Sequence, residues 1–130
     1  MKTKTKNIIG WVLSGFIALM LAASAIDKIL GSEHALQMGA SFGLSSKAYA
    51  VLGIVELLSL VLFLYPKTGV LGTLLLASYF GGAIATHLQH QQDIVFPIAI
   101  EAIVWITAVI RFPELIERLF NKRPVKEELR

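Results

Sequence analysis

Four long apolar runs divide this chain and restrict what it can fold into. The runs cover residues 8–26, 48–65, 69–86 and 94–110. The second contains Glu56 as its only charge, the fourth contains only Glu101, and the other two contain none. About 19 residues reach roughly 28 Å as a helix, which matches the hydrocarbon core of a bilayer. Because the runs are also too long for strands and lack alternation, they predict an all-α chain with four transmembrane helices.

Composition supports lipid as the solvent of these helices. The chain has 130 residues, of which 55% are hydrophobic, and its mean hydropathy is +0.69. A soluble domain of this size has too much surface to bury so many apolar groups. We therefore expect a single membrane domain over residues 1–130. The chain has no cysteine, which excludes disulfides, thiolate metal sites and CxxC redox chemistry.

Helix-breaking residues separate the apolar runs and predict an up-down four-helix bundle with two smaller helices. We expect spans at about residues 8–28, 48–65, 69–88 and 94–111. Residues 33–38 resemble a short interfacial helix, and Ser45 or Ser46 can cap the second span. Residues 113–120 form an amphipathic pattern typical of a helix lying on the cytoplasmic membrane surface.

The first run admits a second interpretation. Three lysines, Lys2, Lys4 and Lys6, precede it, and the segment Ala23-Ser24-Ala25 lies near its end. A basic region, an apolar region and an A-x-A site together describe a cleavable signal peptide. The apolar run is long for a signal peptide. Its removal would leave three helices whose polar residues lack partners, so we favour a retained span.

The distribution of lysine and arginine predicts the orientation. If the four spans alternate in direction, the basic residues on one side of the membrane are Lys2, Lys4, Lys6, Lys67, Arg111, Arg118, Lys122, Arg123, Lys126 and Arg130. The other side receives only Lys28 and Lys47. The positive-inside rule then places both termini in the cytoplasm of a cell-membrane protein. Glutamates alternate with the basic residues of the tail, so an anchor near anionic lipid is expected there instead of a nucleic-acid site.

Polar residues of the spans are expected to meet in the outer half of the bundle. Glu56 lies roughly 12 Å and Glu101 roughly 10 Å below the outer ends of their spans, at about 1.5 Å per residue. Asp27, Lys28 and His87 lie at outer helix ends. An ionised acid in a bilayer costs about 2.5 to 3.5 kcal/mol, so a partner is expected, with Lys28 or His87 as its source. The alternative is that Glu56 and Glu101 are protonated and serve only as hydrogen-bonding groups between the helices.

Small residues in the third span predict close helix packing. Ser78, Gly82 and Thr86 share one face, and Gly81 lies on the neighbouring face. Small residues let helix backbones approach in lipid, so we expect a packing seam here and no phosphate loop.

Aromatic and histidine residues complete the candidate set. Tyr79, Phe80 and Trp105 can supply pocket walls, although adjacent Tyr79 and Phe80 point about 100° apart on a helix. The i, i+3 pair His87 and His90 lies on one helix face, but no further residue has ligand spacing, so no metal site is expected.

Four segments resemble the DoxX-like family of small four-span membrane proteins. They are ASAIDKI, EHALQMGASFGLS, VLGIVELL and, above all, YFGGAIATHL at residues 79–88. The resemblance runs from about Gly10 to Arg111 and implies a compact four-helix membrane bundle. It also implies that Glu56 and His87 occupy the family's recurrent acidic and histidine positions and that Lys28 occupies a basic one. Some relatives resemble subunits of thiosulfate:quinone oxidoreductases, and others are linked to membrane-associated oxidative-stress complexes.

Three functions follow from these residues and this resemblance. The first is an accessory subunit that binds a quinone, lipid or other small molecule in a polar outer-leaflet pocket and serves a redox partner protein. The second is a stand-alone membrane oxidoreductase in which Glu56 or Glu101 exchanges protons and His87 relays them. The third is a small proton-coupled transporter, for which four helices are few unless the chain forms a homo-oligomer. Quinone is the cofactor that the first function implies.

Overall fold

A computed structural model describes residues 2–120, and these residues form helices without any strand. The helices are α1 (Thr3–Leu30), α2 (Glu33–Ser41), α3 (Ser46–Leu64), the short 3-10 helix η1 (Pro66–Thr68), α4 (Gly69–Gln89), α5 (Val95–Arg111) and α6 (Pro113–Leu119). The all-α prediction is confirmed for this part of the chain. The predicted positions of Lys122, Arg123, Lys126 and Arg130 lie outside the described residues.

The helix boundaries follow from local capping chemistry. Gly31 adopts a left-handed φ of 66° and ends α1, as a glycine after a helix commonly does. The Ser32 hydroxyl accepts a hydrogen bond from the Ala35 amide and begins α2. The Ser45 hydroxyl accepts from the Ala48 amide and begins α3, as predicted from the sequence. Pro66 disfavours helical geometry in the residue before it, and α3 ends there.

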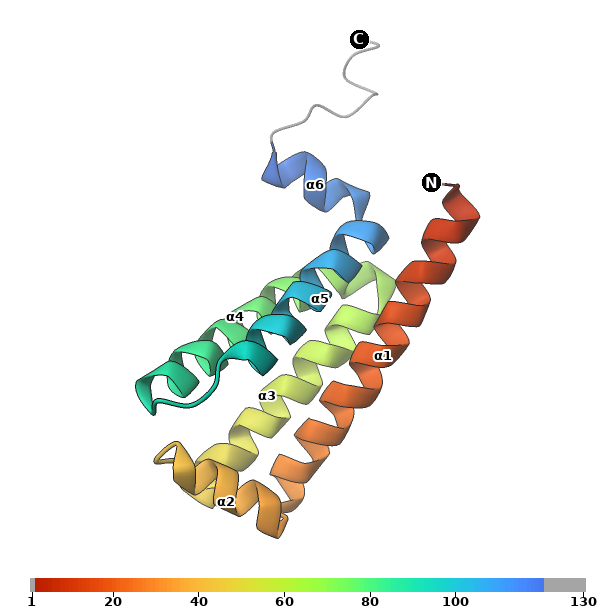
Figure 1. Cartoon of the computed structure of the whole chain (residues 1–130). Helices are drawn as coiled ribbons and strands as arrows, with labels where there is room; N and C mark the ends of the chain where they lie inside the picture. The colour runs from red at the N-terminus through yellow and green to blue at the C-terminus, as the bar shows by residue number, and fades with distance from the viewer. Residues whose placement is uncertain (1, 121–130) are drawn as a thin grey trace.

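The four long helices pack in a ring, with α1 against α3, α3 against α4, α4 against α5, and α5 back against α1 (Figure 1). The helix α2 lies across the end of α1 and α3 that is remote from the start of α1 and from α6 (Figure 1). The core between the long helices includes Ile17, Phe63, Leu76 and Val104, each at most 2% exposed. The helix α2 therefore covers the far ends of α1 and α3.

Hydroxyl groups in this core bond to their own helices. Ser14, Thr73 and Thr107 are fully buried, and each hydroxyl donates to the carbonyl oxygen four residues earlier at 2.7 to 2.8 Å. This back-bonding satisfies a polar group where no water is available. The core is therefore compatible with an apolar environment.

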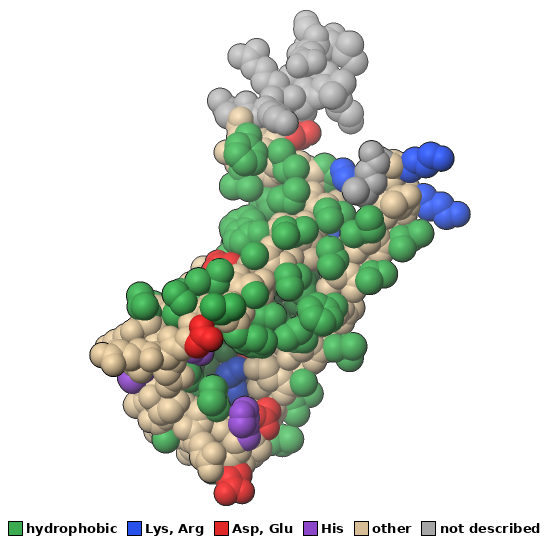
Figure 2. All heavy atoms as spheres, viewed as in Figure 1, with side chains coloured by type: hydrophobic (Ala, Val, Ile, Leu, Met, Phe, Trp, Pro, Cys, Tyr) green, Lys and Arg blue, Asp and Glu red, His purple; other side chains and the backbone are tan. Residues whose placement is uncertain are grey.

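The outer faces of the long helices are apolar. Figure 2 shows hydrophobic side chains spread along the visible surface of α1 and α5, and Leu19 and Val12 are 76% and 65% exposed. By length and composition, α1, α3 and the segment Pro66–Gln89 can each cross a membrane. A fourth span is reached if α5 is counted with α6, which bends away from it by 106°. The chain thus has three to four candidate spans within the described residues.

Arg111 ties the other end of the helical ring together. Its guanidinium donates to the carbonyl oxygens of Phe63 and Leu64 at 2.9 and 3.1 Å. These carbonyl groups lie in the last turn of α3 and have no donor within the helix. The same group lies 4.8 Å from the centroid of the Trp11 ring and 4.7 Å from that of Phe112. The helices α1, α3 and α5 are therefore fastened together at this end.

Candidate functional site

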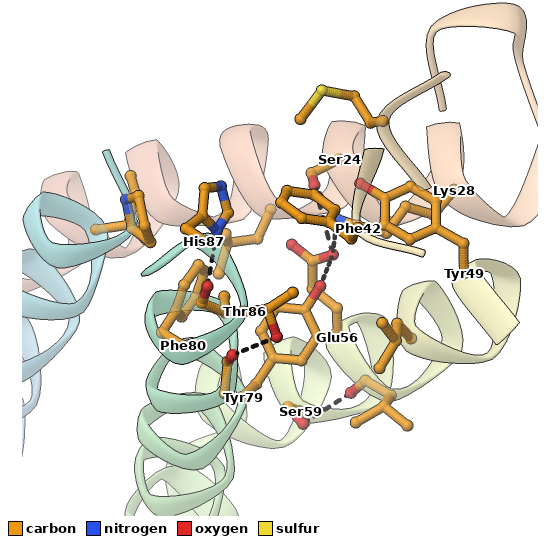
Figure 3. Close-up of a pocket in the computed structure, with 18 of the residues that line it drawn as sticks. Ser24, Lys28, Phe42, Tyr49, Glu56, Ser59, Tyr79, Phe80, Thr86 and His87 are labelled. Atoms are coloured by element: carbon orange, nitrogen blue, oxygen red, sulfur yellow. Dashed lines mark hydrogen bonds and ion pairs between the residues drawn. The ribbon is translucent and has the colours of Figure 1, made fainter. Parts of the chain in front are cut away.

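Glu56 lies inside the helical ring and is paired. Glu56 is 1% exposed and lies in the middle of α3 (Figure 3). Lys28 of α1 places its ammonium nitrogen 2.8 Å from Oε2 of Glu56, and the two side chains are 12% and 2% exposed. A carboxylate and an ammonium buried together compensate one another, whereas either alone would carry a large desolvation cost.

Two hydroxyl-bearing side chains complete a network around this pair. Tyr79 of α4 donates its hydroxyl to Oε2 of Glu56 at 3.1 Å, and the Ser24 hydroxyl lies 3.4 Å from the same oxygen. The Lys28 ammonium also donates to the Ser24 oxygen at 2.6 Å. Figure 3 shows these groups converging on one oxygen of the carboxylate. Three helices, α1, α3 and α4, therefore share a single polar cluster.

Two tyrosine rings flank the Lys28 ammonium. Its nitrogen lies 5.5 Å from the centroid of the Tyr49 ring and 5.9 Å from that of Tyr79. The negative face of an aromatic ring attracts a cation at such distances. The cation is thus stabilised by one carboxylate and two rings in a setting where water is scarce.

Gly53 explains how α1 can come close enough to form this pair. A Cβ atom at Gly53 would lie 2.8 Å from the Ala25 carbonyl oxygen and 2.8 Å from Cβ of Lys28. Gly53 lies three residues before Glu56 and therefore on the same face of α3. The absence of a side chain at this position allows the α1 backbone to pack against α3 beside the ion pair.

A cavity of about 670 Å³ opens beside the polar cluster. It is lined from five helices, α1, α2, α3, α4 and α5, and from residues 42 and 44 of the connection between α2 and α3. Figure 2 shows a hollow between α1 and α5 near the α2 end, with basic and histidine side chains visible inside it. Volumes of 300 to 1,000 Å³ are typical of small-molecule sites.

Most of the cavity wall is apolar. Leu21, Phe42, Phe80 and Ile100 are buried core residues that line it. The polar cluster around Glu56 occupies one part of an otherwise hydrophobic wall. A few convergent polar groups in an apolar cleft are the usual composition of a ligand site.

His87 lines the cavity without pairing with Glu56. Its Nδ1 lies 2.7 Å from the Ala83 carbonyl oxygen, which can only accept, so Nδ1 carries the proton in this bond. Its ring packs at a tilt on Phe42, with centroids 4.7 Å apart. Of the two predicted sources of positive charge, Lys28 is the one that contacts Glu56.

Asp27 lies at the rim of the cavity on the far end of α1. Its Oδ2 lies 3.2 Å from Nδ1 of His34, which belongs to α2, and both residues line the cavity. The His34 side chain is 77% exposed, so this contact belongs to the surface. Asp27 therefore joins α1 to α2 and does not enter the polar cluster.

Glu101 and Trp105 are the two candidates that the structure places outside the cavity lining. The buried face of α5 is formed by Pro97, Ile100 and Val104, and a helix turns by about 100° per residue. Glu101 is consequently directed to the flank of α5, half-buried, and makes no hydrogen bond to the Glu56 network among the described residues. Trp105 packs against the apolar core instead. Glu101 thus does not line the cavity that Glu56 lines.

The predicted packing seam in α4 is wrong. A Cβ atom built at Gly81 or at Gly82 would meet nothing within 4 Å. Among the glycines of α4 that were predicted or found near α3, Gly72 is the one that meets its backbone, next to Leu62 and Phe63. From there to its other end α4 leaves room, and Ser78, Gly82 and Thr86 line the cavity. The small residues therefore widen the cavity instead of closing it.

The family model described as the DoxX-like family matches residues 12–110 of the chain. The chain belongs to the DoxX-like family. The resemblance noted from the sequence is thereby confirmed, and the matched region includes Glu56, Lys28, Tyr79 and His87. Neither the curated proteins nor the solved structures include a significant match. Family membership together with the apolar helices identifies a multi-pass membrane protein.

Two residues of the site in this DoxX-like protein were missed from the sequence. Ser24 lies one turn before Lys28 and Tyr49 lies two turns before Glu56, so both share a face with a predicted candidate. That spacing was the available signal. Within residues 2–120, no group of three or more His, Cys, Asp or Glu side chains is arranged to hold a metal ion.

Proposed function

We propose that this DoxX-like protein is a binding subunit that holds a lipid-soluble small molecule, such as a quinone or a lipid, and presents it to a redox partner protein. One observation carries the proposal: the buried Lys28–Glu56 pair lies in the wall of an otherwise apolar cavity among membrane-spanning helices. Packed hydrophobic residues would be at least as stable as such a pair, so its presence favours a functional role. Ionisable groups within membrane segments commonly mark ligand or proton pathways.

The proposal includes a definite arrangement in the cell membrane. The helices α1, α3, α4 and α5 form an up-down four-helix transmembrane bundle with both termini in the cytoplasm. Among the described residues, lysine and arginine gather at the end where α1 begins and α5 ends, and Lys28 and Lys47 are the exceptions. The cavity then belongs to the outer leaflet, under α2.

Single-cysteine labelling tests this orientation. The chain has no cysteine, so Lys47→Cys and Lys67→Cys each introduce a unique thiol at an exposed position. A membrane-impermeant maleimide added to intact cells is expected to label Lys47→Cys only. Lys67→Cys should react after the membrane is permeabilised. The reverse pattern would invert the bundle and move the cavity to the inner leaflet.

A second candidate function is proton transfer by the protein alone. The observation that favours it is the direct contact between the Tyr79 hydroxyl and Oε2 of Glu56, with Lys28 on the same oxygen. Such a cluster can redistribute a proton when a ligand binds. Turnover by the purified protein without a partner, lost in Glu56→Gln, would support this function over a binding subunit.

A pair of glycine variants tests the binding function. Gly82→Leu places a side chain in the cavity, whereas Gly81→Leu places it on the neighbouring face, and neither Cβ meets an obstacle. Filling the cavity should cost about 1.5 to 3 kcal/mol of ligand binding, or roughly tenfold or more in affinity. We expect native mass spectrometry of protein purified in mild detergent to show a bound small molecule for wild type and Gly81→Leu. Gly82→Leu should carry about a tenth as much or less.

The two glycine variants share the same helix and the same gain of helix propensity, so each controls for the folding of the other. A wild-type protein without any bound small molecule, or equal amounts in all three proteins, would contradict the binding function.

A further inference from the structure

The Glu56 carboxylate uses only one of its two oxygens. Lys28, Ser24 and Tyr79 all approach Oε2, and no group within residues 2–120 hydrogen-bonds to Oε1. The residue is 1% exposed and lines the cavity. An ionised carboxylate can accept about four hydrogen bonds. No fully buried side-chain nitrogen or oxygen of the described residues lacks a partner, so Oε1 is accessible from the cavity. Oε1 therefore offers a strong acceptor to whatever occupies the cavity.

Tyr49 offers a complementary group. It lines the cavity and is half-buried, and its hydroxyl has no hydrogen-bond partner among the described residues. Figure 3 shows its ring beside Lys28, with its hydroxyl directed toward the region of Phe42 and Glu56. A phenolic hydroxyl can donate as well as accept. The site thus presents an acceptor and a donor on one apolar wall.

We propose that the ligand is a neutral, apolar molecule that carries a hydroxyl group. Its O–H donates to Oε1 of Glu56, and its oxygen accepts from the Tyr49 hydroxyl. The apolar body lies against Leu21, Phe80 and Ile100. This inference rests on the proposed binding function and adds the chemical class of the ligand.

Other head groups fit these residues less well. An anionic head group would face the Glu56 carboxylate, whose charge is already balanced by Lys28. A cationic one would compete with the Lys28 ammonium for that carboxylate. An ether or a ketone, and therefore the oxidised form of a quinone, can accept from Tyr49 but leaves Oε1 without a donor. Among quinones, the reduced quinol form carries the hydroxyl that this site requires. A hydroxyl is the smallest neutral group that serves both positions.

A matched pair of probes tests the inference on the wild-type protein. The compound 1-naphthol and its methyl ether, 1-methoxynaphthalene, share the apolar body and the oxygen, and only the first has an O–H. Affinities are measured in detergent micelles by calorimetric titration, with empty micelles as the blank. A hydrogen bond to a charged group favours 1-naphthol by about tenfold or more. Equal affinities would overturn the inference.

Two variants test which residue causes the preference for 1-naphthol over its methyl ether. The double variant Lys28→Met with Glu56→Leu removes both charges together and leaves neither one buried alone. The ratio of the two affinities should fall to about one in this protein. Tyr49→Phe should weaken both probes alike and keep the ratio, because both oxygens accept from Tyr49. A preference for 1-naphthol that survives in the double variant would place its O–H elsewhere.

The same titrations separate this inference from the binding function. Binding of both probes with equal affinity, lost in Gly82→Leu, would retain the cavity as a binding site and overturn only the hydroxyl requirement. Binding of neither probe, or binding indifferent to Gly82→Leu, would overturn the inference together with its basis.

Discussion

Glu56→Leu is expected to lower the free energy of unfolding by about 3 to 5 kcal/mol, because it leaves a buried ammonium without its carboxylate. The Lys28 side chain is 12% exposed and donates to Glu56 at 2.8 Å. Ser24 would be its remaining hydrogen-bond partner, and a hydroxyl cannot balance a charge. Unfolding in a titration with sodium dodecyl sulfate, followed by circular dichroism, measures the change.

Two further variants test whether the charge is the cause. Adding Lys28→Met to Glu56→Leu should restore most of the lost stability, since the unpaired charge is gone. Glu101→Leu is the matched control, because Glu101 is half-buried on α5 and makes no hydrogen bond within the described residues. It should not lower the stability by more than about 0.5 kcal/mol, because it leaves no buried charge without its partner. Glu56→Leu as mild as Glu101→Leu would show that the pair does not form.

Gly72→Ala is expected to destabilise the protein by about 2 to 3 kcal/mol, near the upper end for overpacking. The added Cβ would overlap the backbone N and Cα of Phe63, and backbone atoms cannot rotate away as a side chain can. The helices α3 and α4 would have to separate near the turn that joins them, and the core around Phe63 and Leu76 would loosen.

Gly81→Ala in the same helix should have the opposite sign. Its Cβ meets nothing within 4 Å, so the gain in helix propensity of up to about 1 kcal/mol remains. The same detergent titration compares the two variants. If Gly72→Ala were as stable as Gly81→Ala, the close approach of α3 and α4 would be wrong.

The helices and the need of Glu56 for a partner could be predicted from the sequence. Apolar runs bounded by Gly31, Ser45 and Pro66 define helix ends through local chemistry alone, and the structure has helix boundaries at these residues. A single acid in such a run needs a partner. Lys28 was one of two cations at the right depth, and the structure places it against Glu56.

The positions around each helix axis could not be predicted in the same way. Depth along a span puts Glu101 level with Glu56, but depth does not say which face of α5 points inward. The packing of apolar side chains sets the inward face of α5. Ile100 and Val104 fill the core, so Glu101 lies on the flank. A partner on another helix is visible only once the helices are packed, which is why Tyr49 and Ser24 were missed.

Helix crossing points set a similar limit. Gly72, Gly81 and Gly82 are equally small, and any of them could have been the place where α4 touches α3. The crossing lies at Gly72, and the distance between the helices beyond it makes Gly82 part of a cavity wall. Such a difference depends on the whole packing of the helices and has no local signal.

A density map of the protein in a lipid nanodisc tests most directly whether these helices enclose a ligand beside a buried ion pair. We expect the Lys28 ammonium on Oε2 of Glu56 and non-protein density within hydrogen-bond distance of Oε1. A map in which Glu56 turns toward the acyl chains, apart from Lys28, with side chains filling the space between α1, α4 and α5, would contradict this structure of the site and the function proposed from it.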